Sequence, residues 1–206
     1  MEPARVCILD YGSGNVRSVY NLLLSMRTAC VISNDEKDID NSTHLILPGV
    51  GAFGAAMEKI KNRIPLDILK QNVFEHKKPF LGICVGMQVL ADKGSEFGMH
   101  KGLGWIPGEV NKLDSGDLPL PHIGWNDIAI VNSCPLLNGL DLLKDFYFVH
   151  SYILDPADHS GTMAETVYGK AFASVVQKEN IYGVQFHPEK SQEAGKMIMK
   201  NFLMIQ

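Results

Sequence analysis

The chain has 206 residues, of which 46% are hydrophobic and 20% charged, and its formal net charge is −4. This composition is typical of a globular protein with a sizeable core, and the small negative charge gives it no attraction to nucleic acid or an anionic membrane. No apolar run approaches the roughly 18 residues of a membrane-spanning helix.

The cysteines argue for free thiols. The four are far apart, at Cys7, Cys30, Cys84 and Cys134, without a Cys-x-x-Cys pair. This spacing argues against a zinc site and a disulfide framework, so we expect no bound metal or other cofactor. The first ten residues lack the basic start and long apolar region of a secretory signal. Together these features predict a cytoplasmic protein.

In the first half of the chain, strand-like apolar runs alternate with segments of helical periodicity. We expect strands at residues 5–11, 29–34, 44–54 and 78–84. We expect helices at residues 14–27, 55–61, 65–76 and 86–92. The alternation predicts an α/β fold with a mostly parallel, doubly wound sheet.

The second half, from about residue 102 to residue 189, has short strand-like runs, turn signals and almost no helical pattern. It predicts antiparallel strands that extend the same sheet. A last helix is expected at about 194–203. Because no low-complexity linker or internal repeat interrupts the sequence, we predict that residues 1–206 form a single domain.

Residues 79–92, PFLGICVGMQVLAD, place Cys84 in a Gly-x-Cys-x-Gly pattern between a predicted strand and a predicted helix. This is the context of a nucleophile elbow, in which Gly82 and Gly86 let the backbone approach itself closely. The thiol would lie at the carboxyl edge of the sheet and at a helix N-terminus, which favours a thiolate. Taken alone, the pattern fits a buried structural cysteine equally well.

A thiolate nucleophile needs a base, and His187 is the best placed of the seven histidines. It ends the apolar run IYGVQF, and Glu189, two residues later, would lie on the same side of an extended chain. The carboxylate could hold one imidazole nitrogen and leave the other facing Cys84. His122 and His150 are weaker candidates. The alternative for His187 is a surface histidine at a strand end, and its context favours the catalytic interpretation over that one.

Acyl transfer also requires hydrogen-bond donors for an oxyanion. The segment PGVGAFG after Leu47 could bring one backbone N–H group to the site, and Val85 could supply another. An ordinary Gly/Pro turn is the commoner meaning of such a segment, so only its pairing with the elbow favours the catalytic interpretation. The order Cys, His, acid differs from that of α/β-hydrolases and argues against that fold.

Together these motifs resemble the class I glutamine amidotransferases, through GICVGMQ around Cys84 and VQFHPEKSQEAG around His187. The segments ILDYGSGNVRSV, LILPGVGAFG, PHIGWN and FYFVHSY narrow the resemblance to the glutaminase subunits of imidazole glycerol phosphate synthases, nearly end to end. It implies a flavodoxin-like sheet with an antiparallel extension, helices on both faces and a nucleophile elbow. It also implies hydrolysis of glutamine to glutamate and ammonia.

The resemblance assigns roles to matching positions. Cys84 would attack the glutamine amide, His187 would transfer the proton, and Glu189 would orient the imidazole. The oxyanion would be bound by the N–H of Val85 and, after a peptide rearrangement, by that of Val50 in the segment with Gly51. The substrate would be held by Gln88, Glu96, Ser151 and Tyr152. Within this last set, Glu96 would receive the α-ammonium group, and the backbone of the two neighbouring residues would hold the α-carboxylate.

The resemblance also implies a heterodimer. Glutaminase subunits of this family dock on a (β/α)8-barrel synthase, through which the ammonia passes to make imidazole glycerol phosphate and the purine-pathway carboxamide in histidine biosynthesis. The positions that would face this partner are Asn15, Trp125, Asn126 and Lys190. No contact with nucleic acid or membrane is expected.

Three alternatives remain open from the sequence. A paralogous subunit could supply ammonia for nitrogen-containing surface sugars, because the catalytic residues alone do not separate the two partners. A solitary cysteine hydrolase or peptidase is a second alternative, against which the residues Gln88 and Glu96 argue. A catalytically inactive interaction subunit is a third, and the intact Cys84, His187 and Glu189 argue against it.

Overall fold

The computed structural model describes residues 3–140 and 145–206. Its largest sheet has eight strands, in the order β2-β1-β3-β4-β14-β13-β12-β9. The parallel strands are β2 (Ala29–Ile32), β1 (Arg5–Ile8), β3 (His44–Gly49), β4 (Phe80–Cys84) and β14 (Ile181–Val184). Their order is that of a flavodoxin-like sheet, so the predicted fold class is confirmed.

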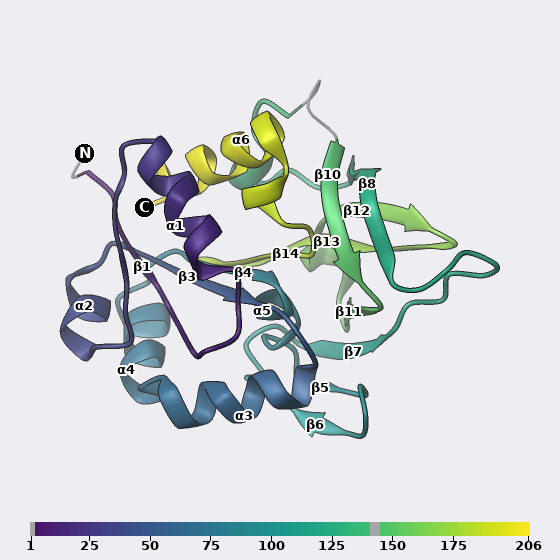
Figure 1. Cartoon of the computed structure of the whole chain (residues 1–206), viewed down its shortest axis with the longest axis horizontal. Coiled ribbons are helices and arrows are strands. Elements are labelled where there is room, and N and C mark those ends of the chain that lie inside the picture. The colour runs from purple at the N-terminus through teal and green to yellow at the C-terminus, as the bar shows by residue number, and fades with distance from the viewer. Residues whose placement is uncertain (1–2, 141–144) are drawn as a thin grey trace.

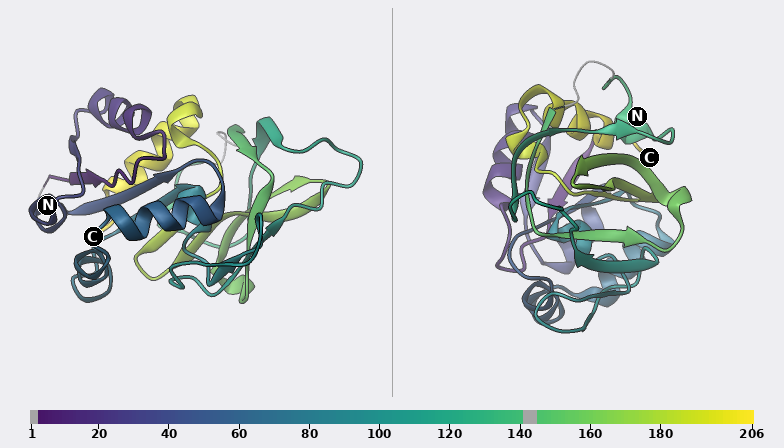
Figure 2. Two further views of the ribbon diagram at one scale, coloured as in Figure 1. Left: turned by 60° about the horizontal axis from the view of Figure 1, so that its bottom comes forward. Right: turned by 90° about the vertical axis from the view of Figure 1, so that its right-hand side faces the viewer.

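Helices cover both faces of the parallel strands (Figures 1 and 2). One face carries α1 (Val16–Ser25) and α6 (Gln192–Leu203). The other carries α2 (Glu36–Asn41), α3 (Phe53–Arg63) and α4 (Leu66–Lys70), the last continuing into the π-helical turn η1 (Gln71–Glu75). Every residue of β3 and β4 is buried, as expected for central strands covered on both faces.

Two helices differ from the sequence-based expectation. The short helix α2 was not predicted, although Asp35 caps it by accepting a hydrogen bond from the Lys37 N–H. The helix after Cys84 was expected to reach residue 92, but α5 (Val85–Gln88) is a single turn. The Leu90 carbonyl accepts hydrogen bonds from the N–H groups of residues 105 and 106, so tertiary contacts replace the continuing helix.

The second half does extend the sheet with antiparallel strands: β13 (Lys170–Lys178), β12 (Thr162–Tyr168) and β9 (Ala129–Ile130). The other short strands do not join it, contrary to expectation. β8 (His122–Asp127) pairs with β10 (Asp145–His150). The remaining four form a third sheet: β11 (Tyr152–Pro156), β7 (Gly108–Lys112), β5 (Lys93–Gly94) and β6 (His100–Lys101).

The separate sheets follow from side-chain packing. Alternate residues of β10 are buried, so this strand buries one face only. The His122 ring of β8 packs on Tyr168 of β12 and Phe172 of β13, which layers β8 and β10 over the antiparallel strands. Three 3-10 turns complete the described elements: η2 (Pro135–Leu137), η3 (His159–Gly161) and η4 (Pro188–Lys190).

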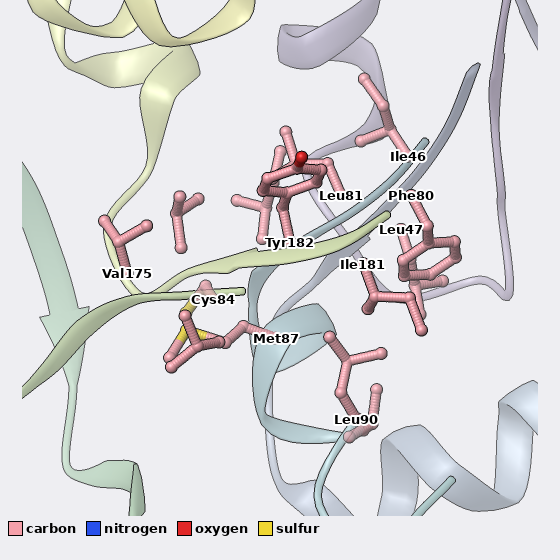
Figure 3. Packing of buried hydrophobic residues seen from close by; sticks show 14 of the residues in the cluster. Ile46, Leu47, Phe80, Leu81, Cys84, Met87, Leu90, Val175, Ile181 and Tyr182 are labelled. Atoms are coloured by element: carbon pink, nitrogen blue, oxygen red, sulfur yellow. The ribbon is translucent and has the colours of Figure 1, made fainter. Parts of the chain in front are cut away.

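The core packs tightly around the junction of β4 and α5 (Figure 3). Phe80 and Leu81 of β4 lie there with Ile181 and Tyr182 of β14, and all four side chains are buried. Met87 of α5 packs against Gly183, where a Cβ would come within 2.6 Å of its Cγ. The turn after Cys84 is thereby fixed to the sheet.

Among the residues described, none belongs to a helix with the length and apolarity needed to span a bilayer.

Candidate active site

Cys84 ends β4 and immediately precedes α5, with a backbone φ of 54° and ψ of −114°. A non-glycine residue with this conformation is strained, which is typical of a nucleophile elbow. A Cβ at Gly82 would overlap the Gly86 carbonyl, and a Cβ at Gly86 would overlap the Leu47 carbonyl. Both glycines are therefore required by the close approach of the turn to itself and to β3.

The predicted catalytic side chains lie at one edge of the sheet. β14 runs parallel to β4, with Val184 opposite Ile83, so Cys84 and His187 follow neighbouring carboxyl ends. His187 Nδ1 lies 2.8 Å from Glu189 Oε1, and the two side chains are 2% and 1% exposed. Nε2 has no hydrogen-bond partner among the residues that the structure describes, and His187 lines the same cavity as Cys84.

The charges of this group support one another. Burial lowers the pKa of His187, but the neighbouring Cys84 and the hydrogen bond with Glu189 outweigh it and raise the pKa to about 10. Burial raises the pKa of Glu189, yet its hydrogen bonds with His187 and Asn15 lower it overall. An ionised Glu189 therefore stabilises a protonated His187, as a proton donor to a leaving amine requires.

A cavity of about 170 Å³ opens above the elbow. The predicted catalytic, oxyanion and substrate residues that line it are Val50, Gly51, Cys84, Val85, Gln88, Glu96, Ser151, Tyr152 and His187. Glu189 is the one member of these sets that does not line the cavity, because it lies behind the imidazole. Val149 and His150 complete the wall.

The predicted oxyanion segments approach the thiol from two sides. Val85 is the first residue of α5, directly after Cys84, so its N–H lies at the start of that helix. Gly51 has a φ of +90°, and Val50 before it is 42% exposed. The buried Tyr11 hydroxyl lies close to both the Val50 N–H and Cys84. A positive φ at Gly51 permits a sharp bend between β3 and α3.

Two glutamines connect the substrate wall with the thiol. Gln88 Nε2 donates to the Tyr152 carbonyl at 2.8 Å and to Gln185 Oε1 at 3.0 Å. Gln185 Nε2 in turn donates to the Cys84 sulfur at 3.6 Å. The sequence-based prediction missed Gln185, although a polar residue within the apolar run IYGVQF is a signal of a buried polar contact.

Glu96 lines the cavity from the segment that follows β5. Its Oε2 accepts a hydrogen bond from the Phe53 N–H at 2.9 Å, which satisfies a free donor at the start of α3. This contact fixes the carboxylate on the cavity wall. Its position fits the predicted contact with an α-ammonium group.

The predicted partner-facing residues do not all lie together. Trp125 is 49% exposed and packs edge-on against Tyr147, with ring centroids 6.0 Å apart. Lys190 Nζ lies 5.2 Å from the same Tyr147 ring. Asn126, the neighbour of Trp125, donates to the Val167 carbonyl at 3.0 Å. Tyr147 was missed in the sequence, although it lies within the motif FYFVHSY.

Asn15 lies apart from this aromatic cluster and contacts Glu189, the predicted catalytic acid. Its Nδ2 donates to Glu189 Oε1 at 2.9 Å, and its Oδ1 accepts from the Ser18 hydroxyl at 2.7 Å. Asn15, which was predicted to face a partner, therefore holds Glu189 in place, and Glu189 in turn holds His187. In the parts of the chain that the structure describes, no group of three or more His, Cys, Asp or Glu side chains could hold a metal ion.

The sequence matches known proteins along nearly its whole length. The model of the family "Glutamine amidotransferase class-I" matches residues 7–206. The HisH protein of imidazole glycerol phosphate synthase from Zymomonas mobilis is 44% identical over 206 residues, covering 96% of this chain and 94% of the relative. The HisH protein of Aquifex aeolicus is 42% identical, covering 96% of this chain and 95% of the relative.

Solved structures agree with the fold. The structure of PurLQS from Thermotoga maritima superposes with a TM-score of 0.73 at 21% identity, covering 98% of each chain. A glutamine amidotransferase from the same organism has a TM-score of 0.61 at 16% identity, covering 92% of this chain and 77% of the other. With both the family model and the close relatives spanning nearly its whole length, the chain belongs to the class-I glutamine amidotransferases and, within them, to the HisH subunits of imidazole glycerol phosphate synthase.

Proposed function

We propose that this chain hydrolyses glutamine to glutamate and ammonia, and that the ammonia feeds the cyclase that makes imidazole glycerol phosphate in histidine biosynthesis. The observation that carries the proposal is the placement of Cys84, His187 and Glu189 beside one small cavity. Its volume of about 170 Å³ is below the roughly 300–1,000 Å³ typical of drug-sized ligands and suits a free amino acid.

The chemistry follows the positions of these side chains. The Cys84 thiolate attacks the amide carbon, and N–H groups of the elbow and of the Val50 segment stabilise the oxyanion. Protonated His187 gives its proton to the leaving nitrogen, so the C–N bond breaks, ammonia departs and a thioester remains. The neutral imidazole then takes a proton from water, whose oxygen attacks the thioester and releases glutamate and the thiolate.

The substrate would be held by its two opposite charges. Glu96 binds the α-ammonium group, and backbone N–H groups at Ser151 and Tyr152 bind the α-carboxylate. Gln88 fixes the Tyr152 carbonyl and so supports this wall. Specificity for a free amino acid argues against a peptidase, whose substrate carries neither charge at an internal bond.

We infer that the partner is a (β/α)8-barrel cyclase, bound as a heterodimer through the cluster formed by Trp125, Tyr147 and Lys190. The relatives are named as subunits of imidazole glycerol phosphate synthase, which does not favour a partner in surface-sugar synthesis.

We further infer a cytoplasmic enzyme and a single domain. The eight-stranded sheet, with strands from both halves of the chain, supports the single domain.

The test is a glutaminase assay on the purified chain, alone and with the barrel cyclase and its nucleotide ligand. Glutamate release should rise when the partner and ligand are present. Cys84→Ala should lower the rate by about a thousandfold or more. The matched control Cys30→Ala removes a half-buried thiol elsewhere and should leave the rate unchanged. Full activity of Cys84→Ala would refute the proposed nucleophile.

A further inference from the structure

Two buried histidines outside the predicted catalytic group are in direct contact. His122 of β8 and His150 of β10 are paired across the two-stranded sheet and are 2% and 6% exposed. His122 Nδ1 lies 3.1 Å from His150 Nε2. His150 also lines the candidate active-site cavity. The pair therefore connects the cavity wall with β8.

The positions of the protons on the two imidazole rings follow from the hydrogen bond that His150 makes with a backbone carbonyl. The Tyr152 carbonyl can only accept, so His150 Nδ1, 3.1 Å away, carries a proton and donates. Burial and the neighbouring His122 lower the pKa of His150 to about 3, so its ring is neutral and Nε2 accepts. His122 Nδ1 must then donate to it, which makes His122 Nε2 an acceptor.

Asn126 supplies the donor at the other end. Its Nδ2 lies 3.2 Å from His122 Nε2 and also donates to the Val167 carbonyl at 3.0 Å. Its Oδ1 accepts from the Asp127 N–H at 2.8 Å, so both ends of the amide are fixed. The hydrogen bonds thus run in a single direction: Asn126 to His122, His122 to His150, and His150 to Tyr152.

The rings of this relay have little freedom to turn. His122 stacks on Tyr168 with centroids 4.0 Å apart and on Phe148 with centroids 5.0 Å apart. His150 packs edge-on against Phe172 at 5.0 Å. Aromatic contacts of this kind hold the imidazole planes in the orientation that the hydrogen bonds need.

The Tyr152 carbonyl is where two hydrogen-bond chains meet. One is the relay through His150, and the other leads through Gln88 and Gln185 to the Cys84 sulfur. A carbonyl that accepts two buried hydrogen bonds has both lone pairs occupied, so its peptide plane is held in place. Tyr152 also lines the active-site cavity, so the relay fixes a part of the cavity wall.

We propose that His150 and His122 are positioning residues that hold the Ser151–Tyr152 backbone in the orientation required to bind the α-carboxylate of glutamine. This inference rests on the proposed glutaminase function and adds two residues to it. The α-carboxylate is held equally in the ground state and in the transition state, so loss of the relay raises KM and leaves kcat nearly unchanged.

The first test measures glutamate release by the complex with the barrel cyclase and its nucleotide ligand. In His150→Gln the amide lies where Nε2 was, so the donation to Tyr152 is lost and KM for glutamine should rise about fivefold. In His150→Asn the amide lies where Nδ1 was, so KM should return close to the wild-type value. His159→Gln, which changes an exposed histidine, is the control.

The second test uses His122. His122→Phe keeps the stacked ring but removes both hydrogen bonds, and KM should rise about threefold, whereas His122→Asn retains the donor and restores KM. In parallel, ¹⁵N NMR of the imidazole nitrogens should find both wild-type rings neutral and protonated on Nδ1. Thermal unfolding of each variant checks its fold, and the wild-type spectrum tests the relay even when a variant fails to fold.

The outcomes separate the two proposals. A wild-type complex without glutamate release refutes the glutaminase function. An active wild type whose KM is unchanged in His150→Gln and His122→Phe, or whose rings are protonated on Nε2, refutes the relay alone. A fall in kcat that the asparagine variants do not restore also refutes it, because such a loss is one of structure.

Discussion

The side chain of Asn15 contacts the proposed catalytic residues through a single donor. Its Nδ2 bonds to Glu189 Oε1, the same oxygen that receives His187 Nδ1. A buried carboxylate needs such donors, because an ionised group without them is costly to bury. Asn15 Oδ1 accepts a hydrogen bond from the Ser18 hydroxyl, which fixes the Asn15 side chain to the first turn of α1.

Replacing Asn15 with alanine tests this contact. The loss of one donor should allow the pKa of Glu189 to rise and should lower kcat by about fivefold to tenfold. The acid limb of the kcat profile should move to higher pH. The measurement is the pH dependence of glutamate release by the complex, with Ser13→Ala as a neighbouring control. An unchanged acid limb would contradict the role of Asn15.

The raised pKa of His187 makes a prediction about stability. The folded-state pKa of about 10 lies above the ordinary value of 6.5. Protonation of His187 therefore stabilises the folded state, and this contribution is complete below pH 6.5 and is lost as the pH rises toward 10. Urea unfolding from pH 6 to 10 should show that the difference in free energy of unfolding between wild type and His187→Gln becomes smaller as the pH rises. A difference that grows with pH would have the wrong sign.

At the level of elements, the elbow shows how sequence and packing combine. The Gly-x-Cys-x-Gly pattern indicated the turn. The reason that Gly86 must be glycine is seen only in the structure, where β3 lies beside the turn. The Leu47 carbonyl occupies the space that a Gly86 side chain would need. Since β3 and β4 are adjacent and fully buried, the backbone has no room to move away.

Gly86→Ala should therefore lower the free energy of unfolding by about 3 kcal/mol or more. The matched control is Gly116→Ala, at a φ of +58° with no atom within 4 Å of its Cβ, which should cost only about 1 kcal/mol of backbone strain. Equilibrium denaturation measures both. A loss in Gly86→Ala no larger than that in Gly116→Ala would contradict the close-packing requirement, because Gly86 has no positive φ to strain.

At the level of the whole molecule, Trp125 and Tyr147 lie on the small sheet of β8 and β10, and Lys190 lies beside them on η4. Aromatic residues with a neighbouring cation are typical of interface hot spots. The proposed partner would cover them. Because these residues lie on or near the elements that also carry His122, His150 and His187, docking there is close to the catalytic edge.

Trp125→Ala should weaken binding of the barrel cyclase by about tenfold to a hundredfold and leave the fold intact. The control is Val31→Ala, which shortens an exposed side chain on β2, an edge strand of the large sheet. Calorimetric titration of each variant with the cyclase measures the affinity. Equal affinity for wild type and Trp125→Ala would remove this cluster from the proposed interface.

The sequence by itself determined the alternation of parallel strands and helices, the elbow at Cys84 and the His187–Glu189 pair, because each depends on local periodicity or on spacing of a few residues. Only the tertiary structure decided the short α5, the second and third sheets, and the contacts of Asn15, Gln185 and His150. The contacts of Asn15, Gln185 and His150 join residues that lie 174, 101 and 28 positions apart in the chain, and no local pattern encodes how such segments pack.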